Sequence, residues 1–232
     1  MQEGFTRAWD NQSHKIVHVR ELSRTRNGAK CDCTCVDCKG ALEALQGPVN
    51  DWSFRHQTST TCKGGPMTAL HMLAQELLSG DQTIKVKGGE VSYTNATKEW
   101  PIPDSRYKAD VVGVKADDTK FLIEIFVTHK LQDEEEKVKL IRKQEIHSIE
   151  IDLSKVDLEI SRENLLDLLL TNVSKQRVIY SPKMETSTVL AEQPKPENKD
   201  DSLSWFEWLI ITLGLLWVCN QIKRLIFGGR RR

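Results

Sequence analysis

Apolar residues recur at helical spacing in three parts of the chain, and we expect a helix in each. The predicted helices cover residues 68–79, 133–144 and 161–170. In the first, four leucines from Leu70 to Leu78 fall at positions i, i+3, i+7 and i+8, which places them on one face. The third also has a start signal, because Ser161 suits the N-cap and Asn164 then takes the third helical position.

Short apolar or alternating segments predict strands around these helices. They cover residues 15–19, 83–87, 107–114, 120–128 and 148–153. The polar run at residues 115–120 is typical of a turn, so the third and fourth of these strands should form a hairpin. A helix, a hairpin, a second helix and a strand in this order are typical of an α/β fold with a mixed sheet.

The bulk composition suits one folded body with attachments and indicates no partner. At 232 residues the chain has room for one substantial domain. Its 33 basic residues balance its 33 acidic ones, so any binding to nucleic acid or membrane must rest on local clusters. The first twenty residues are polar and lack a signal-peptide pattern, so we expect the protein in the cytoplasm.

Two acidic residues inside the predicted hairpin are its main chemical signal. Asp110 and Glu124 each stand in a short apolar strand, and a carboxylate there is costly to bury unless it is paired or binds a metal. Two of them on neighbouring strands can meet at one Mg²⁺ ion, which prefers oxygen ligands. The alternative is that alternation places Glu124 on an exposed face of an edge strand, and on these two residues alone we favour that alternative.

A cysteine-rich section precedes the first predicted helix. Five of the six cysteines lie between residues 31 and 62, and no secretory context favours disulfides, so metal binding is the better interpretation. A Cys-x2-Cys turn followed by a histidine and a further cysteine predicts a closed structural zinc site. Its expected ligands are Cys35, Cys38, His56 and Cys62. Cys31 and Cys33 are competitors for the same ion.

Several short motifs follow one another in a specific order. The cysteine pair is followed by Trp52-Ser-Phe-Arg-His56, Thr68-Ala-Leu-His71-Met-Leu-Ala-Gln75 and Arg106-x3-Asp110-Val-Val-Gly113. Glu124-Ile-Phe-Val-Thr-His129, residues 133–137 and Ile149-Glu-Ile-Asp-Leu-Ser154 complete the series. In this order the segments resemble the competence-protein CoiA-like family of the PD-(D/E)XK nuclease superfamily, over roughly residues 31–155.

The resemblance implies a restriction-endonuclease-like mixed sheet flanked by helices, and a metal-dependent hydrolysis of DNA. Asp110 and Glu124 would hold Mg²⁺ or Mn²⁺, with the Ile125 carbonyl as a further ligand, and the metal-bound water would attack the phosphodiester. A lysine normally helps to position that water. Lys137 matches a lysine of the family and Lys130 is the other candidate.

Each of the remaining candidates has a plain structural alternative. Lys137 could pair with Asp133 on a helix surface at i,i+4. His71, which could contact phosphate or metal-bound water, could instead be an ordinary core histidine of an amphipathic helix. His129 could cap a turn, and Arg106 could meet a phosphate or merely flank a strand.

The chain departs from the family at four positions. Ser53 replaces the first histidine of the zinc-side motif, Met67 a glutamate and Gln75 a lysine of the first helix. Phe126 stands where the name of the fold expects a lysine. These changes favour a second function, a catalytically inactive nuclease-fold protein that binds DNA or acts as an adaptor. The surviving acid pair favours the nuclease.

A separate hydrophobic segment, residues 205–227, follows a polar linker. Its uninterrupted apolar core has twelve residues, fewer than the eighteen or more typical of a spanning helix. Tryptophans near its ends and basic residues behind it suit a membrane interface with anionic headgroups. We expect membrane attachment of a cytoplasmic protein through this tail. A short tail anchor, an in-plane helix and a helix buried against a partner remain alternatives.

These observations divide the chain into five parts. We predict a polar segment (residues 1–30), a zinc-binding element (31–66), a nuclease-like α/β domain (67–182), a linker (183–202) and a hydrophobic, basic tail helix (203–232).

Overall fold

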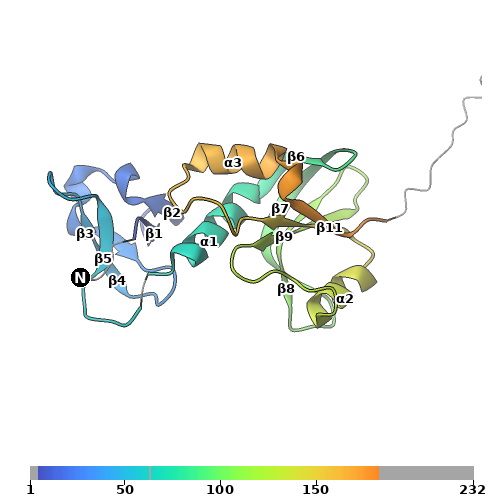
Figure 1. Cartoon of the computed structure of the whole chain (residues 1–232), viewed down its shortest axis with the longest axis horizontal. Coiled ribbons are helices and arrows are strands. Elements are labelled where there is room, and N and C mark those ends of the chain that lie inside the picture. The colour runs from blue at the N-terminus through green and yellow to red at the C-terminus, as the bar shows by residue number, and fades with distance from the viewer. Residues whose placement is uncertain (1–4, 63, 183–232) are drawn as a thin grey trace, which may run out of the picture. The chain divides into compact units, whose positions relative to one another are not determined.

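The computed structural model describes residues 5–62 and 64–182, which fall within the first of two compact units of the chain, Met1–Met184. These residues form two β-sheets and three α-helices, which confirms the α/β class (Figure 1). The predicted linker and hydrophobic tail helix lie outside them. Over the described ranges, no helix has both the length and the apolar character that crossing a membrane requires.

The N-terminal sheet has five antiparallel strands in the order β2-β1-β3-β4-β5. They are β1 (Arg7–Asp10), β2 (Lys15–His18), β3 (Gly28–Thr34), β4 (Ala41–Leu45) and β5 (Ser53–His56). The hydrophobic pattern predicts β2 alone, because the others are short and mixed with polar or cysteine positions. Their small core contains Leu42, Phe54 and three buried cysteines.

The second sheet has six strands in the order β11-β10-β9-β8-β7-β6. They are β6 (Gly80–Val86), β7 (Gly89–Pro101), β8 (Lys108–Val114), β9 (Lys120–Phe126), β10 (His147–Asp152) and β11 (Gln176–Tyr180). The sheet is mixed, as expected, because β9 and β10 run parallel while the other neighbours are antiparallel. Sequence pattern misses β7, whose exposed face is polar along most of its length, and β11.

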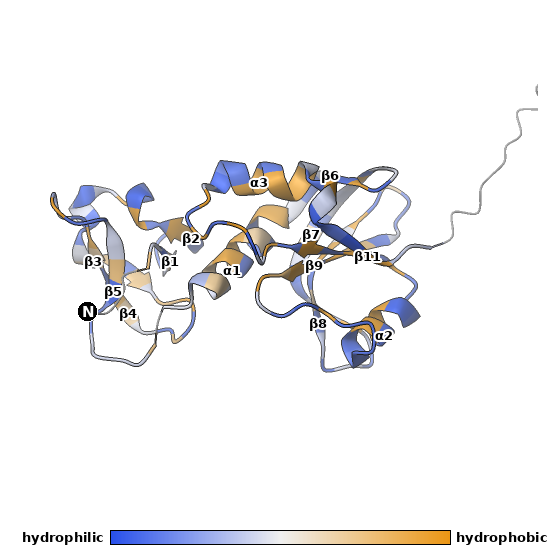
Figure 2. Ribbon diagram, in the orientation of Figure 1, coloured by the Kyte–Doolittle hydropathy of each residue, from blue (hydrophilic) through white to orange (hydrophobic). Residues whose placement is uncertain are grey.

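Helices cover both faces of this sheet. They are α1 (Pro66–Leu78), α2 (Glu136–Lys143) and α3 (Arg162–Thr171), and short 3₁₀ helices occur at Val19–Glu21, Arg24–Arg26 and Val173–Lys175. One core joins α1 and α3 to alternate residues of β9 such as Ile123, and a second joins α2 to the intervening Leu122. In Figure 2, α3 turns its hydrophobic residues inward and its hydrophilic ones outward.

Two helix starts differ from the expected ones and one agrees. α1 begins at Pro66, since proline suits the first helical position. α2 begins at Glu136 instead of residue 133, because Arg142 of α2 and Arg177 of β11 hold the Asp133 carboxylate in the preceding loop. At α3 the prediction is confirmed, because Ser161 Oγ accepts the Asn164 N–H at 3.1 Å.

Gly113 of β8 is required for the close packing of β7 on β8. A Cβ at this position would lie 2.3 Å from Cδ2 of Tyr93, and this buried ring is fixed by its hydroxyl, which donates to the Leu78 carbonyl at 3.0 Å. We expect Gly113→Ala to lower the free energy of unfolding by about 1–3 kcal/mol in urea titration. Gly89→Ala is the control, since no atom lies within 4 Å of its Cβ position. Equal losses in the two variants would contradict this account.

Candidate metal centres

Four carboxylates lie in one row across neighbouring strands of the six-stranded sheet. The register of β7 and β8 places Glu99 opposite Asp110. The register of β8 and β9 places Asp110 level with Glu124, where the ladder between these strands ends. Glu124 in turn pairs with Glu150 of β10. Like charges directly opposite one another are destabilising, so each member of the row requires compensation from another element.

Glu124 is buried, with only 3% of its side chain exposed, so the exposed-face interpretation is wrong. Its Oε2 accepts a hydrogen bond from Nζ of Lys137 at 2.6 Å. The α2 helix supplies this lysine because it lies within the β9–α2–β10 crossover, on the face toward which Glu124 points. The other oxygen, Oε1, is buried and has no hydrogen-bond partner among the described residues.

Lys137 therefore forms an ion pair inside the protein, and the alternative of a surface pair with Asp133 is wrong. Asp133 is bound by Arg142 at 2.6 Å and by Arg177 at 3.3 Å. An i,i+4 pair on one helix also requires both residues within it, and α2 starts only at Glu136. The lysine preferred from the sequence is the one that the fold brings to Glu124.

Asp110 is bound by groups from strand β9 and helix α1. Its Oδ2 accepts the backbone N–H of Ile125 at 2.7 Å and lies 3.2 Å from Nε2 of His71. Its Oδ1 accepts a hydrogen bond from Gln75 Nε2 at 3.3 Å. His71 and Gln75 can act together because they are four residues apart on α1. His71 is thus a partner of a site carboxylate, not merely a core residue.

The two acids open into a cleft of about 520 Å³. His71 and Lys137 line it together with Asp110 and Glu124. Its other walls include Met67, Tyr107, His129 and Glu150. Of the remaining sequence candidates, Arg106 is exposed and stacks over the Tyr107 ring at 5.1 Å, with its guanidinium 3.8 Å from Glu136. Lys130 and Phe126 are not among the described residues that line the cleft.

The two acids have opposite protonation tendencies. Burial, together with the neighbouring charge of Asp110, raises the pKa of Glu124 to about 8, against the opposing effect of Lys137. Burial also acts to raise the pKa of Asp110, but the hydrogen bond and charge of His71, with Lys137 and the Ile125 N–H, bring it below its usual value. Asp110 is therefore the permanent anion of the pair, and Glu124 is the member that exchanges a proton near neutral pH.

Sequence reasoning misses Glu99 and Glu150. Glu150 had a readable signal, because the parallel strands β9 and β10 carry the same Ile-Glu-Ile triplet at paired positions. Glu99 had none, since its strand was not predicted. It accepts a hydrogen bond from Gln75 Nε2 at 2.7 Å, so this amide bridges Glu99 and Asp110.

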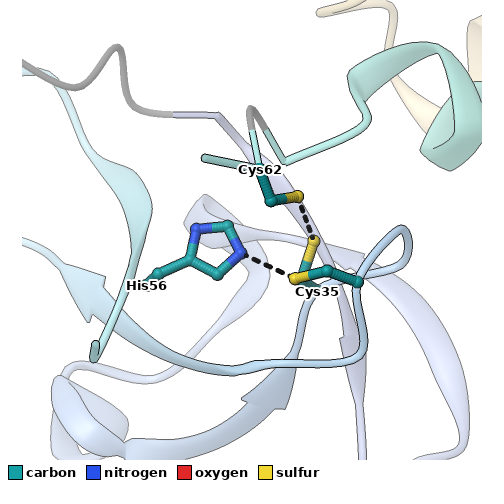
Figure 3. A group of neighbouring side chains, drawn as sticks. Cys35, His56 and Cys62 are labelled. Carbon is teal, nitrogen blue, oxygen red and sulfur yellow. Dashed lines mark hydrogen bonds between the residues drawn. The ribbon is translucent and has the colours of Figure 1, made fainter. Parts of the chain in front are cut away.

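The cysteine-rich section brings together the four residues predicted as zinc ligands. Cys35, His56 and Cys62 gather in one place (Figure 3), and the sulfurs of Cys35 and Cys62 lie 3.8 Å apart. Cys38 Sγ lies 3.2 Å from His56 Nε2. All four ligand atoms lie within 4.8 Å of one another. Ligands around a tetrahedral zinc ion, with zinc–sulfur bonds of about 2.3 Å, stand about 3.8 Å apart. This Cys₃His group can therefore hold a structural metal ion such as zinc.

The two competing cysteines point elsewhere. Cys31 Sγ donates to the Leu42 carbonyl at 3.3 Å and Cys33 Sγ to the Cys31 carbonyl at 3.2 Å. Both are buried in the core of the N-terminal sheet, where they act as small apolar residues.

The start of α1 packs directly against this Cys₃His group. The Gly64 N–H donates to Cys62 Sγ at 3.3 Å, and a Cβ on Gly64 would lie 2.2 Å from the Phe5 ring. Gly65, the N-cap of α1, has φ +54°. A Cβ at Gly65 would lie 2.8 Å from Cβ of Asp37, the residue just before the ligand Cys38 in the sequence. Because α1 begins beside Cys62 and carries His71, this helix connects the Cys₃His group to the acid cleft.

Comparison of the chain with protein-family models, curated proteins and solved structures finds no match in any of the three.

We expect the purified protein to contain about one equivalent of zinc by elemental analysis, and its removal by a chelator to lower the melting temperature by several degrees or more, because a closed site contributes directly to folding. Cys62→Ser should lose the metal. The matched control is Cys33→Ser, which should retain it whatever its effect on stability. A metal-free protein of full stability would contradict the assignment.

The raised pKa of Glu124 predicts a specific pH dependence of stability in the absence of added divalent cations. Between pH 4.5 and about 8 the folded protein binds a proton that the unfolded chain releases, so this group makes the free energy of unfolding fall as pH rises through that window. Glu124→Gln cannot titrate. Urea titrations should show the stability of the variant relative to wild type increasing from pH 5 to pH 8.5. A constant difference would show that Glu124 keeps an ordinary pKa.

Proposed function

We propose that this protein is a divalent-metal-dependent nuclease of the PD-(D/E)XK type that hydrolyses phosphodiester bonds in DNA. One observation carries the proposal. The buried Oε1 of Glu124 has no hydrogen-bond partner among the described residues, and the anion Asp110 is its neighbour. A buried oxygen without a donor is costly, and a cation bound between the two acids removes that cost.

The donor set suits Mg²⁺ or Mn²⁺. Asp110 and Glu124 offer carboxylate oxygens at the point where β8 and β9 separate, and the Ile125 carbonyl follows directly in the chain. A bound ion lowers the pKa of a coordinated water and neutralises charge that builds on the phosphate. The cleft of about 520 Å³ beside these two carboxylates leaves room for the water and a phosphate oxygen.

Lys137 supplies the amine that the fold normally takes from a lysine at the position of Phe126. In this chain the ammonium group comes from the first turn of α2 and reaches Glu124 Oε2 at 2.6 Å. Having three N–H donors, it can hold Glu124 with one and orient a water in the cleft with another. The lysine is thus displaced in sequence but acts at the same carboxylate.

His71 and Gln75 keep Asp110 in place from α1. The imidazole and the amide each contact one oxygen of Asp110, which fixes the carboxylate plane toward Glu124. His71 is 29% exposed and lines the cleft, so it can also meet a phosphate oxygen of a bound strand.

The architecture supports the family-level proposal. A mixed sheet with helices on both faces, two acids on a central hairpin and a Cys₃His element before the first helix occur in the order that the CoiA-like resemblance implies. DNA as the substrate rests on that resemblance. Membrane attachment rests on the sequence of residues 205–227, and a cytoplasmic location rests on the polar character of the first twenty residues.

The alternative is a non-catalytic member of the same fold that binds DNA or acts as an adaptor. The observation in its favour is Gln75, which takes the place of a lysine and is hydrogen-bonded between Glu99 and Asp110. Met67 at the cleft wall likewise replaces an acid with an apolar side chain.

Incubation with single-stranded, duplex and branched DNA in Mg²⁺ or Mn²⁺ tests the proposal. We expect cleavage by the wild type and at least about a hundredfold lower rates for Asp110→Asn, Glu124→Gln and Lys137→Met, because each removes a group that holds the metal or the water. Asp118→Asn, in the exposed turn between β8 and β9, is the matched control. Unchanged cleavage in the acid variants would refute the site, and DNA binding without cleavage by the wild type would select the alternative.

A further inference from the structure

We infer that Glu150 and Arg177 are positioning residues for this nuclease, a proposal that rests on the proposed function. The two side chains hold the loop that leads into α2 and thereby keep Lys137 on Glu124. Neither residue was a sequence candidate, and Arg177 lies 53 positions beyond Glu124.

Glu150 and Arg177 together form a clamp on this loop, and Glu150 is its first part. It is 2% exposed, and both of its carboxylate oxygens are occupied. Oε1 accepts the backbone N–H of Leu131 at 2.9 Å, and Oε2 accepts a hydrogen bond from Nε of Arg177 at 3.0 Å. Both oxygens are thus engaged by the loop backbone and by Arg177, which points to a structural task.

Arg177 of β11 completes the hold on the loop. Its Nη2 donates to the Leu131 carbonyl at 2.7 Å, so the backbone donor and acceptor of Leu131 are both bound by this ion pair. Leu131 is itself buried in the core formed with Val138 and Ile141 of α2. The loop is therefore fixed by its backbone and its side chain together.

A second pair of contacts fixes the next turn of the loop. Arg177 Nη1 lies 3.3 Å from the Asp133 carboxylate, which also accepts a hydrogen bond from Arg142 Nη2 at 2.6 Å. Arg142 in turn donates from Nε to the Ile179 carbonyl at 3.2 Å. One arginine of α2 and one of β11 thus meet on the same acid just before α2 begins.

The clamp determines where the Lys137 ammonium lies. Lys137 is the second residue of α2, so the position of its backbone follows from the loop at residues 131–135. Arg177 has a second effect through charge, because Glu150 is the strand neighbour of Glu124 and lines the same cleft. Without the guanidinium, Glu150 would attract the ammonium away from Glu124.

The experiment uses the full chain and a double-mutant cycle between Arg177→Met and Lys137→Met. Single-turnover DNA cleavage in Mn²⁺ gives the rates, and amide hydrogen exchange gives the protection of residues 127–137. Arg55→Met is the matched control, because Arg55 makes a two-bond pair with Glu43 in the N-terminal sheet. Two further variants serve if Arg177→Met alone unfolds. They are Arg177→Lys and the double variant Glu150→Gln/Arg177→Met, and neither leaves an unpaired buried charge.

We expect Arg177→Met to lower the cleavage rate at least tenfold with Lys137 present and less than twofold in the Lys137→Met background. Exchange should increase at least tenfold across residues 127–137 while β9 and α1 stay protected. Arg177→Lys should recover part of the rate. Equal fractional losses in both backgrounds, or loss of protection spread over the whole sheet, would overturn the inference and leave the nuclease intact. If residual cleavage in Lys137→Met is below detection, the exchange pattern decides. A wild type that cleaves no DNA would overturn both proposals.

Discussion

The placement of four carboxylates in one row of a β-sheet, two of them fully buried, is the constraint on which the rest of this structure depends. Acids at directly paired positions repel one another, and a buried acid also loses its hydration. The four are therefore compensated by side chains from three other elements. Gln75 and His71 of α1 serve Glu99 and Asp110, whereas α2 provides the lysine for Glu124 and β11 the arginine for Glu150. The helices are needed as much for these contacts as for the hydrophobic cores beneath them.

Much of this arrangement could be predicted from local patterns. The three helices follow from apolar residues at helical spacing, the start of α3 follows from its serine cap, and the hairpin follows from two apolar runs with a polar turn between them. The Cys₃His group could be predicted because all four ligands lie within one short section and their residue types are those that zinc prefers. In each case the signal and the structure it specifies lie close together in the chain.

What could not be predicted depends on contacts between distant segments. Alternation alone does not decide whether Glu124 is exposed, because α2, from a later part of the chain, covers that face of its strand. The apolar Leu122 on the same face is a local sign of a strand buried on both sides. β7 escapes notice because its side chains are mostly polar on one face, although Val91 and Tyr93 are buried on the other. Arg177 carries no motif, and its importance appears only when β11 is paired with β10.

The position of Arg177 also has a practical consequence for dividing the chain. Asp110, Glu124 and Lys137 all lie before residue 138, and a fragment that ended after β10 would still contain all three. Such a fragment would leave the Glu150 carboxylate buried without its guanidinium, and the Leu131 carbonyl without its donor. The C-terminal limit of a self-sufficient folded fragment therefore lies beyond β11, because Arg177 of this edge strand neutralises Glu150 and Ile179 completes the core with α2.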